Sequence, residues 1–455
     1  MRLIVKLFTA LALVFLASNL FAFGRASHVV VIVWDGMRPD FVSEETTPTL
    51  IRLARQGVTF RNHHPVYLST TEVNGTALAT GVYPGESGII ANKEFRPAIN
   101  AWKKIQTESL AAIRHSDDAL AHLLAALDQR GLGKETDFIV VSDHGFSTIE
   151  ENADVAETLN SHGFHACRTL PQVGPREGDV MVVGNGGSAF LYVTGHQASR
   201  VERIVHCIQA QPFCGVVFTR TPVEGAFRLH DVRLDSSFAP DIVLSMRWKP
   251  DKSTNGTAGL ICSDYGQYGP GQGMHGSLSP FDMHNLCVAA GPDFRKGVED
   301  DIPSGNLDLA PTVLWILGIK PERKPSGRVL TEAMTEGDDT RPPRETHQLE
   351  ATCRTGGVVW RQYLKYSQVG GVLYFEEGNG EQVSRKDVVG NCLPPAAAAY
   401  LGGNYLAAVG NVEAPARASG HLLAQPSTQL EPCRGLRRAR HFTSRKNCAL
   451  AATGA

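Results

Sequence analysis

Short apolar runs alternate with amphipathic stretches along most of the chain. The runs that predict strands are 28–34, 137–142, 188–193, 215–219, 240–246 and 285–290. The stretches that predict helices are 47–56, 71–80, 108–130, 152–161, 198–210 and 308–317. In 108–130 the leucines and isoleucine recur mostly every three or four positions, which is typical of one buried helix face. Strands interleaved with helices predict an α/β fold, with a mostly parallel sheet and helices on both of its faces.

The two ends of the chain differ from this region. Arg2 and Lys6 precede an apolar stretch at 7–16, and small residues follow near Ala22 and Ala26. This is the pattern of a secretory signal, and the apolar stretch is short for a membrane span. We therefore expect cleavage and export to the periplasm or the extracellular space, with no membrane span left afterwards.

The C-terminal third predicts less regular structure. Residues 335–348 are rich in charge and proline and predict a linker, and 357–376 holds two strand-like runs around a Gly-Gly turn. Beyond 393 the chain is rich in Ala, Gly and Pro with a basic patch, so we expect a disordered tail. The predicted organisation is a signal peptide at 1–26, a main domain at 27–334, a linker with a small strand region at 335–392, and the tail at 393–455.

Charge and cysteine content narrow the classes of function. The 455 residues carry 44 basic and 46 acidic groups, which gives no overall attraction to nucleic acid. Nine cysteines are present, and export permits disulfides. Cys207 with Cys214, and Cys433 with Cys448, are close enough in sequence to pair. None of the cysteines forms a C-x-x-C motif, so we predict no thiolate zinc site.

Two of the predicted strands end in acidic residues. The run 138–141 leads into Asp143-His144-Gly145, and the run 29–33 leads to Asp35. An acid and an imidazole side by side offer a cation one oxygen and one nitrogen ligand. In an open α/β sheet, sites form at the carboxyl ends of strands. A simple turn is the alternative interpretation of Asp-His-Gly.

A hydroxyl cluster, Ser69-Thr70-Thr71, precedes the predicted helix at 71–80. A threonine at a helix start either caps the helix or serves as a nucleophile. The positive helix end and a nearby cation both stabilise an alkoxide and both suit a phosphate. The sequence thus leaves a structural and a catalytic role open for these hydroxyls.

Taken in order, these motifs resemble the type I phosphodiesterase/nucleotide pyrophosphatase family of the alkaline phosphatase superfamily. The resemblance covers about 28–330. It implies an alkaline-phosphatase-like fold and metal-dependent hydrolysis of a small phosphodiester or nucleotide pyrophosphate substrate. The motifs that carry it lie at 31–40, 71–84, 142–145, 274–276 and 306–313.

The resemblance also implies roles for single residues. Asp35, Asp143 and His144 match the ligands of one cation. Thr71 matches the nucleophile, which also binds that cation and forms a covalent phospho-threonine; Thr70 is the alternative if the register is off by one. Two zinc ions are expected for the family, and the ligands here without thiolate also suit manganese.

Two further residues match the family pattern. Asn92 corresponds to the asparagine that donates a hydrogen bond to a phosphoryl oxygen. His275 corresponds to a ligand of the second cation, which stabilises the leaving oxygen in a two-metal displacement.

The chain departs from the family between Asn92 and Asp143. That interval is short, and it lacks the Asp-x-x-x-His pair that completes the second metal site in the family. We infer that an internal segment containing a strand and helices is missing from the fold. Asp117 and Asp118 are expected on a solvated helix face rather than as replacements. The nearby candidates for replacement ligands are Glu108, His115, Asp117 and Asp118.

Three functional hypotheses follow. The first is hydrolysis of phosphodiester or nucleotide pyrophosphate bonds through a threonine nucleophile. The second is a catalytically impaired family member that binds one metal ion or a phosphate ligand. The third is a phosphomonoesterase or sulfatase-like hydrolase; against the sulfatase, this chain has Thr71 where sulfatases of the superfamily usually have Cys or Ser.

Overall fold

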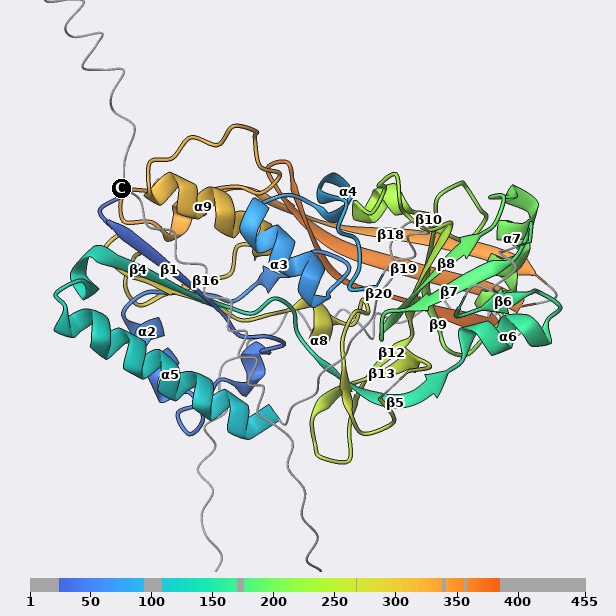
Figure 1. Ribbon diagram of the computed structural model, residues 1–455, viewed down its shortest axis with the longest axis horizontal. Coiled ribbons are helices and arrows are strands. Elements are labelled where there is room, and N and C mark those ends of the chain that lie inside the picture. The colour runs from blue at the N-terminus through green and yellow to red at the C-terminus, as the bar shows by residue number, and fades with distance from the viewer. Residues whose placement is uncertain are drawn as a thin grey trace, which may run out of the picture. The chain divides into compact units, whose positions relative to one another are not determined.

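The computed structural model describes residues 24–93, 109–169, 176–266, 268–337, 341–355 and 358–384. All of them belong to one compact unit. Figure 1 shows that helices and sheets alternate in layers, which confirms the α/β prediction. Within the described ranges, no helix combines the length and the apolar character that crossing a membrane requires.

A five-stranded sheet carries the two predicted acidic strand ends. Its order is β1-β4-β15-β2-β16. β1 and β4 are parallel neighbours, with Val33 paired to Val141. The bounds are β1 His28–Val33, β4 Thr136–Val141, β15 Cys287–Ala290, β2 Val58–Phe60 and β16 Val298–Asp300.

Helices cover both faces of this sheet, as predicted. On one face, Phe138 and Val140 of β4 pack in a cluster with α2 (Pro48–Arg55) and α5 (Ser109–Gln129). On the other face, the alternate residues Ile139 and Val141 pack in a cluster with α9 (Leu309–Ile316). α3 (Thr71–Thr80) packs beside α9. This alternation follows from the period-two geometry of a strand that is buried on both sides.

The expectation of a mostly parallel sheet is wrong. β15 runs antiparallel to both of its neighbours, β4 and β2. The reason lies at the tip of β4, where Gly145 N donates to Asp282 O of the short helix α8 (Pro280–Met283). The chain leaves α8 at this same end of the sheet, so β15 starts beside Val141 and runs back.

A second, six-stranded sheet has the order β10-β9-β11-β8-β7-β6. One of its faces is covered by α6 (Val155–Ser161) and α7 (Ala198–Gln209). The bounds are β10 Phe227–Arg228, β9 Cys214–Thr219, β11 Ile242–Met246, β8 Ser188–Val193, β7 Val180–Gly184 and β6 Ala166–Cys167.

Smaller elements join these two sheets. A four-stranded sheet has the order β12-β13-β5-β14, and β17 pairs with β3. The strands are β12 Trp248–Lys252, β13 Ala258–Asp264, β5 Ser147–Ala153, β14 Gly273–Met274, β17 Ser304–Gly305 and β3 His63–His64. The remaining helices are α4 Pro84–Ser87, η1 Pro39–Phe41, η2 Gly133–Glu135, η3 Leu229–Val232, η4 Asn306–Asp308 and η5 Thr331–Ala333.

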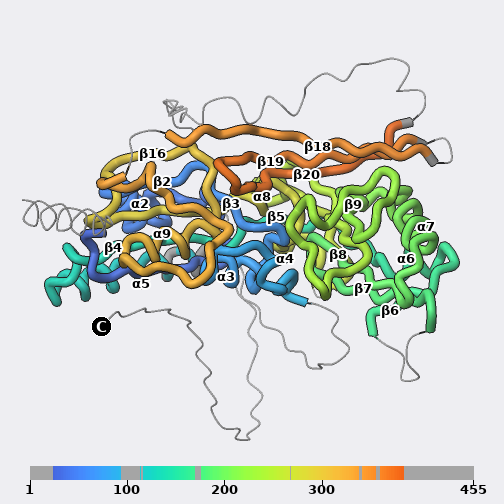
Figure 2. Tube along the Cα trace, turned by 90° about the horizontal axis from the view of Figure 1, so that it is seen from above, coloured from blue at the N-terminus to red at the C-terminus, as the bar shows by residue number. Residues whose placement is uncertain are grey.

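Three long antiparallel strands follow, and they correct the predicted linker at 335–348. They are β18 (Arg344–Thr355), β19 (Val358–Val369) and β20 (Val372–Ser384). Residues 344–348 of the predicted linker are already in β18, because they pair with residues 365–369 of β19. Figure 2 shows the three strands lying across the other layers.

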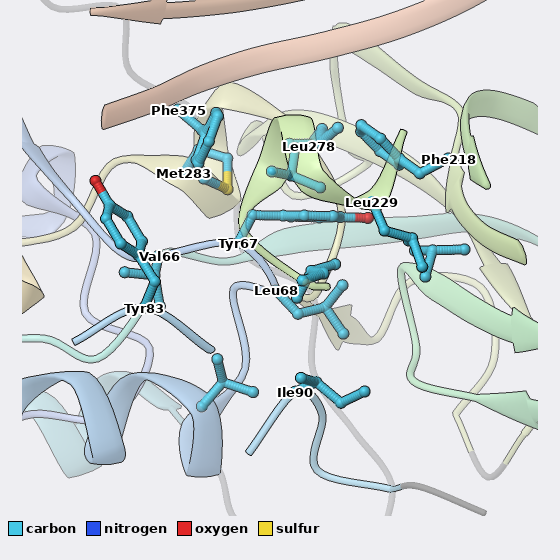
Figure 3. Close-up of a cluster of buried hydrophobic side chains, with 14 of the residues drawn as sticks. Val66, Tyr67, Leu68, Tyr83, Ile90, Phe218, Leu229, Leu278, Met283 and Phe375 are labelled. Atoms are coloured by element: carbon cyan, nitrogen blue, oxygen red, sulfur yellow. The ribbon is translucent and has the colours of Figure 1, made fainter. Parts of the chain in front are cut away.

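The largest buried cluster lies where these layers meet, and it anchors the segment that precedes α3. Val66, Tyr67 and Leu68 are at most 2% exposed. In Figure 3 the ring of Tyr67 lies in the middle of the cluster between Leu278 and Leu68. Its hydroxyl is 3.0 Å from Ser188 Oγ, so the buried polar tip is satisfied. The segment leading to Thr71 is therefore held by the core.

Two expectations concern the N-terminal end of the chain and its cysteines. The predicted signal peptide, 1–26, includes three residues that pack on the fold: Gly24 N donates to Ile316 O, and Ala26 N donates to Asp293. Residues 1–23 and the predicted tail lie outside the described residues, so export stays a prediction. Cys207 and Cys214 are both free thiols, and Cys214 is buried in the core.

One edge of the five-stranded sheet carries no strand partner within the described ranges. Among the described strands, β1 is the outermost one there and pairs only with β4. Every residue of β4 is buried, whereas most of β1 is half-buried and Val33 is 48% exposed. An apolar edge of this kind is unusual for a native sheet.

Candidate functional site

The parallel register of β1 and β4 brings their acidic ends together. Val33 pairs with Val141, and Trp34 N donates to Val141 O at 2.8 Å. Asp35 and Asp143 each follow the paired valines by two residues. The two carboxylates therefore lie side by side at one edge of the sheet, where sites in α/β folds form.

Asp143 is buried and has one oxygen without a partner. Its Oδ1 accepts hydrogen bonds from Gly36 N at 3.0 Å and His144 N at 3.1 Å. Its Oδ2 is buried, and it has no hydrogen-bond partner among the described residues. A buried carboxylate oxygen without a donor is costly, and a bound cation is the usual way to satisfy it. Gly36 permits the close turn, since it has φ +68° and a Cβ there would meet the Phe146 ring.

His144 turns its second nitrogen toward the carboxylates. Its Nδ1 lies 2.8 Å from Gly145 O and donates to that carbonyl, which leaves the Nε2 lone pair free to bind a metal. Nε2 is 3.3 Å from Asp143 Oδ2 and 3.6 Å from Asp35 Oδ1. The potential ligand atoms of these three residues all lie within 4.8 Å of one another. Two carboxylates and one imidazole suit zinc or manganese.

Asp35 forms the open side of this group. Its side chain is 68% exposed, whereas Asp143 and His144 are almost fully buried. Desolvation and the neighbouring Asp143 carboxylate raise the pKa of Asp35 above its ordinary value. Two carboxylates held this close repel each other unless a cation lies between them, which is the electrostatic pattern of a metal site.

Thr71 is the first residue of α3 and its hydroxyl points to the same group. Thr71 Oγ1 lies 3.2 Å from His144 Nε2. Thr70, the residue before the helix, is 1% exposed and its hydroxyl has no hydrogen-bond partner. Of the two threonines that the sequence left open, the geometry favours Thr71 as the one that faces the candidate ligands.

Asn92 lies against the start of the same helix. Its Oδ1 accepts a hydrogen bond at 3.1 Å from the backbone N–H of Glu72, the residue after Thr71. This contact uses the amide oxygen, so the amide N–H groups remain to face a ligand beside Thr71. Thr71 and Asn92, which are 21 positions apart in the sequence, therefore meet at one helix N-terminus.

His275 stacks on His144 instead of forming a separate ligand cluster. The two ring centroids are 3.8 Å apart with 17° between the planes. His275 Nδ1 lies 2.9 Å from Ser69 O and donates to it, and burial with the nearby His144 lowers the pKa of His275 far below its ordinary value. The ring is therefore neutral, with Nε2 as its lone-pair nitrogen. Across the described ranges, the group formed by Asp35, Asp143 and His144 is the sole cluster of three potential ligands.

Of the considered replacements for the second metal site, Asp117 and Asp118 are among the described residues, and neither joins a group of potential ligands. Asp117 is 2% exposed, and its carboxylate accepts hydrogen bonds from Thr49 N and Leu50 N at the start of α2. Its expected place on a solvated helix face is wrong, because it caps another helix. Asp118 is exposed. Glu108 and the side chain of His115 lie outside the described residues.

Sequence reasoning missed Ser142, which joins the two strand ends. Its Oγ accepts from Met37 N at 2.7 Å and donates to His144 O at 2.7 Å. The signal for it was present, since a buried serine follows an apolar strand directly before Asp143. His63 is a packing residue, with its ring nitrogens bonded to Ser304 and Asn306.

A curated relative, an uncharacterized pyrophosphatase/phosphodiesterase of Schizosaccharomyces pombe, is 37% identical over 98 residues. The match covers 21% of this chain and spans only 20% of that relative's length. Among solved structures, human ectonucleotide pyrophosphatase/phosphodiesterase 5 has a TM-score of 0.49 at 14% identity, covering 68% of this chain and 100% of that one.

A family model described as type I phosphodiesterase/nucleotide pyrophosphatase matches residues 29–109 and 101–276. The two segments together span more than half of the chain and include Asp35, Thr71, Asp143 and His144. The chain belongs to the type I phosphodiesterase/nucleotide pyrophosphatase family.

Proposed function

We propose that this chain hydrolyses phosphodiester or nucleotide pyrophosphate bonds of small substrates, with Thr71 as the nucleophile. One observation carries the proposal. The Thr71 hydroxyl lies 3.2 Å from His144 Nε2, a potential ligand atom of the group that Asp35, Asp143 and His144 form. These three residues would hold a divalent cation, and the partnerless Oδ2 of Asp143 fits one.

A cation held there would lower the pKa of the Thr71 hydroxyl and so supply a nucleophile at neutral pH. The Thr71 oxygen then attacks phosphorus, the bond to the leaving oxygen breaks, and a phospho-threonine forms that water hydrolyses. The N-terminus of α3 presents backbone N–H groups and a positive dipole end to the phosphoryl group. Asn92, held by Glu72 N, would donate from its amide to a phosphoryl oxygen.

The test is hydrolysis of bis(p-nitrophenyl) phosphate by the zinc-loaded protein. We expect Thr71→Ala to abolish turnover and Thr70→Ala to keep most of it. Thr80→Ala is the matched control, because Thr80 lies at the far end of the same helix. No turnover above the Thr71→Ala level would refute the proposal, and faster turnover of the phosphate monoester would favour a phosphomonoesterase.

A second candidate function is supported by the short interval between Asn92 and Asp143, where the sequence lacks the expected Asp-x-x-x-His pair. The family match is split into two segments that meet at 101–109, inside the short interval between Asn92 and Asp143. The edge of β1, which has no partner among the described strands, also supports a missing strand. Without the second cation, the leaving oxygen lacks its stabilising charge. The chain would then bind one metal ion or a phosphate ligand without efficient catalysis.

Metal content separates the two candidates. Zinc is measured by mass spectrometry on the purified full chain after dialysis. One equivalent per chain, lost in Asp143→Asn, together with turnover no faster than that of Thr71→Ala, supports the binding function. Two equivalents per chain would contradict it, because a second set of ligands would then have to exist.

A further inference from the structure

Two buried asparagines connect the two halves of the site. One half is the start of α3 with Thr71, and the other is the end of β4 with Asp143 and His144. Asn74 comes from α3 and Asn306 from η4, and both side chains are fully buried. Asn306 Nδ2 donates to Asn74 Oδ1 at 3.0 Å. The side chains thus form a direct link between the helix that carries Thr71 and the rest of the site.

Asn74 fixes the chain on the approach to Thr71. Its Nδ2 donates to Leu68 O at 3.0 Å and to Thr70 O at 3.2 Å, and its Oδ1 accepts from Val66 N at 2.8 Å. Asn74 is one helical turn after Thr71, so the segment that enters the helix is bonded to the helix itself. Any shift of Asn74 moves the start of α3.

Asn306 fixes the strand end that carries the candidate ligands. Its Nδ2 also donates to Asp143 O at 2.6 Å. Its Oδ1 accepts from Asn285 Nδ2 at 3.0 Å and lies 3.1 Å from His63 Nε2. Burial lowers the pKa of His63 to about 3, so its ring is neutral and donates through Nε2 while Nδ1 faces Ser304.

Every hydrogen-bonding position of the Asn306 amide is therefore used. The amide N–H groups face two acceptors, and the carbonyl oxygen faces two donors, so only one orientation of the amide satisfies all four partners. A buried amide with complementary partners on both ends is stiff. It resists changes in the spacing between the groups that it bonds.

We propose that Asn306 is a positioning residue that sets the distance between the Thr71 hydroxyl and the group formed by Asp35, Asp143 and His144. It acts through Asn74 on the side of Thr71 and through the Asp143 backbone on the other side. The inference rests on the proposed function. A displacement of about 1 Å at a reacting centre is enough to lower a rate about 100-fold.

The test uses Asn306→Asp, which has nearly the same shape but no amide donor. Its second oxygen would face Asn74 Oδ1 and Asp143 O, so the link between the halves becomes repulsive. With bis(p-nitrophenyl) phosphate, we expect kcat to fall about 100-fold while KM and zinc stoichiometry stay the same. Asn160→Asp is the control, because the exposed Asn160 also forms hydrogen bonds through both amide ends but lies in α6, away from α3 (Figure 1).

A spectroscopic measurement separates this inference from the proposed function. The visible absorption of bound Co²⁺ depends on which groups reach the ion. We expect Thr71→Ala to alter the spectrum of the Co²⁺-loaded protein, and Asn306→Asp to alter it in the same way while Asn160→Asp leaves it unchanged. If the wild-type protein shows no turnover, the proposed function fails, and the spectrum alone still decides the inference.

Two results would overturn the inference. One is a folded Asn306→Asp protein with wild-type kcat or a wild-type Co²⁺ spectrum. The other is a fall in kcat that only tracks the fraction of unfolded protein. If Asn306→Asp does not fold, Asn306→Ser replaces it, since serine is smaller and keeps one donor. A folded Asn306→Ser protein is then held to the same two criteria.

Discussion

At the scale of single residues, Asp143 is where metal binding should have a direct effect on the stability of the fold. Its buried Oδ2 has no donor, so the carboxylate is destabilising without a cation and favourable with one. Zinc binding should therefore appear as a gain in the free energy of unfolding, about 2.7 kcal/mol at a zinc concentration 100 times Kd.

Asp143→Asn is expected to remove this gain. In the wild type, His144 Nε2 lies 3.3 Å from Asp143 Oδ2. The new amide would donate a hydrogen bond to this nitrogen. Without metal, the free energy of unfolding of the variant should therefore equal that of the wild type or exceed it by about 1 kcal/mol. Thermal unfolding with and without zinc measures both effects. Asp251→Asn, at an exposed position, serves as the control and should keep the wild-type response. A zinc-induced rise in Tm that survives in Asp143→Asn would contradict the assignment of this ligand.

Asp137, at the opposite end of β4, predicts a pH dependence of stability. Burial and the nearby Asp293 raise the pKa of Asp137 to about 8. Because its folded pKa lies above the unfolded value, its contribution to stability is complete below about pH 4 and is lost as pH rises through about 8. From this group alone, the free energy of unfolding should fall by up to about 1.4 kcal/mol per pH unit in that window.

Asp137→Asn should flatten that slope, since an amide does not ionise. Urea unfolding at pH 5, 6.5 and 8 measures it, with Asp251→Asn as the variant expected to keep the wild-type slope. Equal slopes in wild type and Asp137→Asn would show that another group is responsible.

At the scale of secondary-structure elements, apolar periodicity was a reliable guide to position. Each predicted strand and helix corresponds to an element within a few residues; for example, 108–130 became α5 and 137–142 became β4. Their partners were not predictable in the same way. The direction of β15 depends on the contact between α8 and the end of β4. Residues 344–355 form the strand β18 because they pair with β19.

The contact between α2 and α5 gives a prediction at this scale. α2 starts with Pro48 and has no capping side chain of its own, so Asp117 of α5 supplies the cap from outside. Asp117→Ala would leave two buried N–H groups without partners, and we expect it to lower the free energy of unfolding by about 1–3 kcal/mol.

Asp118→Ala is the matched control for this cap. Asp118 is the next residue on the same helix but is exposed, so its loss should change stability by no more than about 0.5 kcal/mol. Guanidinium unfolding of both variants gives the comparison. Similar losses in the two would mean that helix propensity, and not the cap, is the cause.

At the scale of the whole molecule, the candidate site was predictable where it depends on strand ends. Asp35, Asp143 and His144 follow apolar runs, and the register of β1 with β4 brings them together. The supporting groups were not predictable, because Asn306 and Asn285 reach the site from segments far along the chain. Nothing local in a sequence indicates which buried amide will meet which carbonyl.

The open edge of β1 predicts how the molecule behaves in concentrated solution. Unpaired apolar strands associate with one another, so the refolding yield should fall as protein concentration rises. Val33→Lys, at the 48% exposed end of β1, should raise the soluble yield measured by light scattering. Ile319→Lys is the matched control, since Ile319 is 51% exposed but lies outside any strand. Equal improvement by both would point to general solubility instead.

The same edge of β1 also suggests that a separate polypeptide could add a strand to this sheet. A strand with one free side can be completed by a separate polypeptide, just as two fragments of a split protein rebuild one sheet. A short apolar peptide supplied in trans would then protect the outward amides of β1 from hydrogen exchange. The peptide would pair with β1 as an added strand, and the completed sheet would contain strands from two molecules.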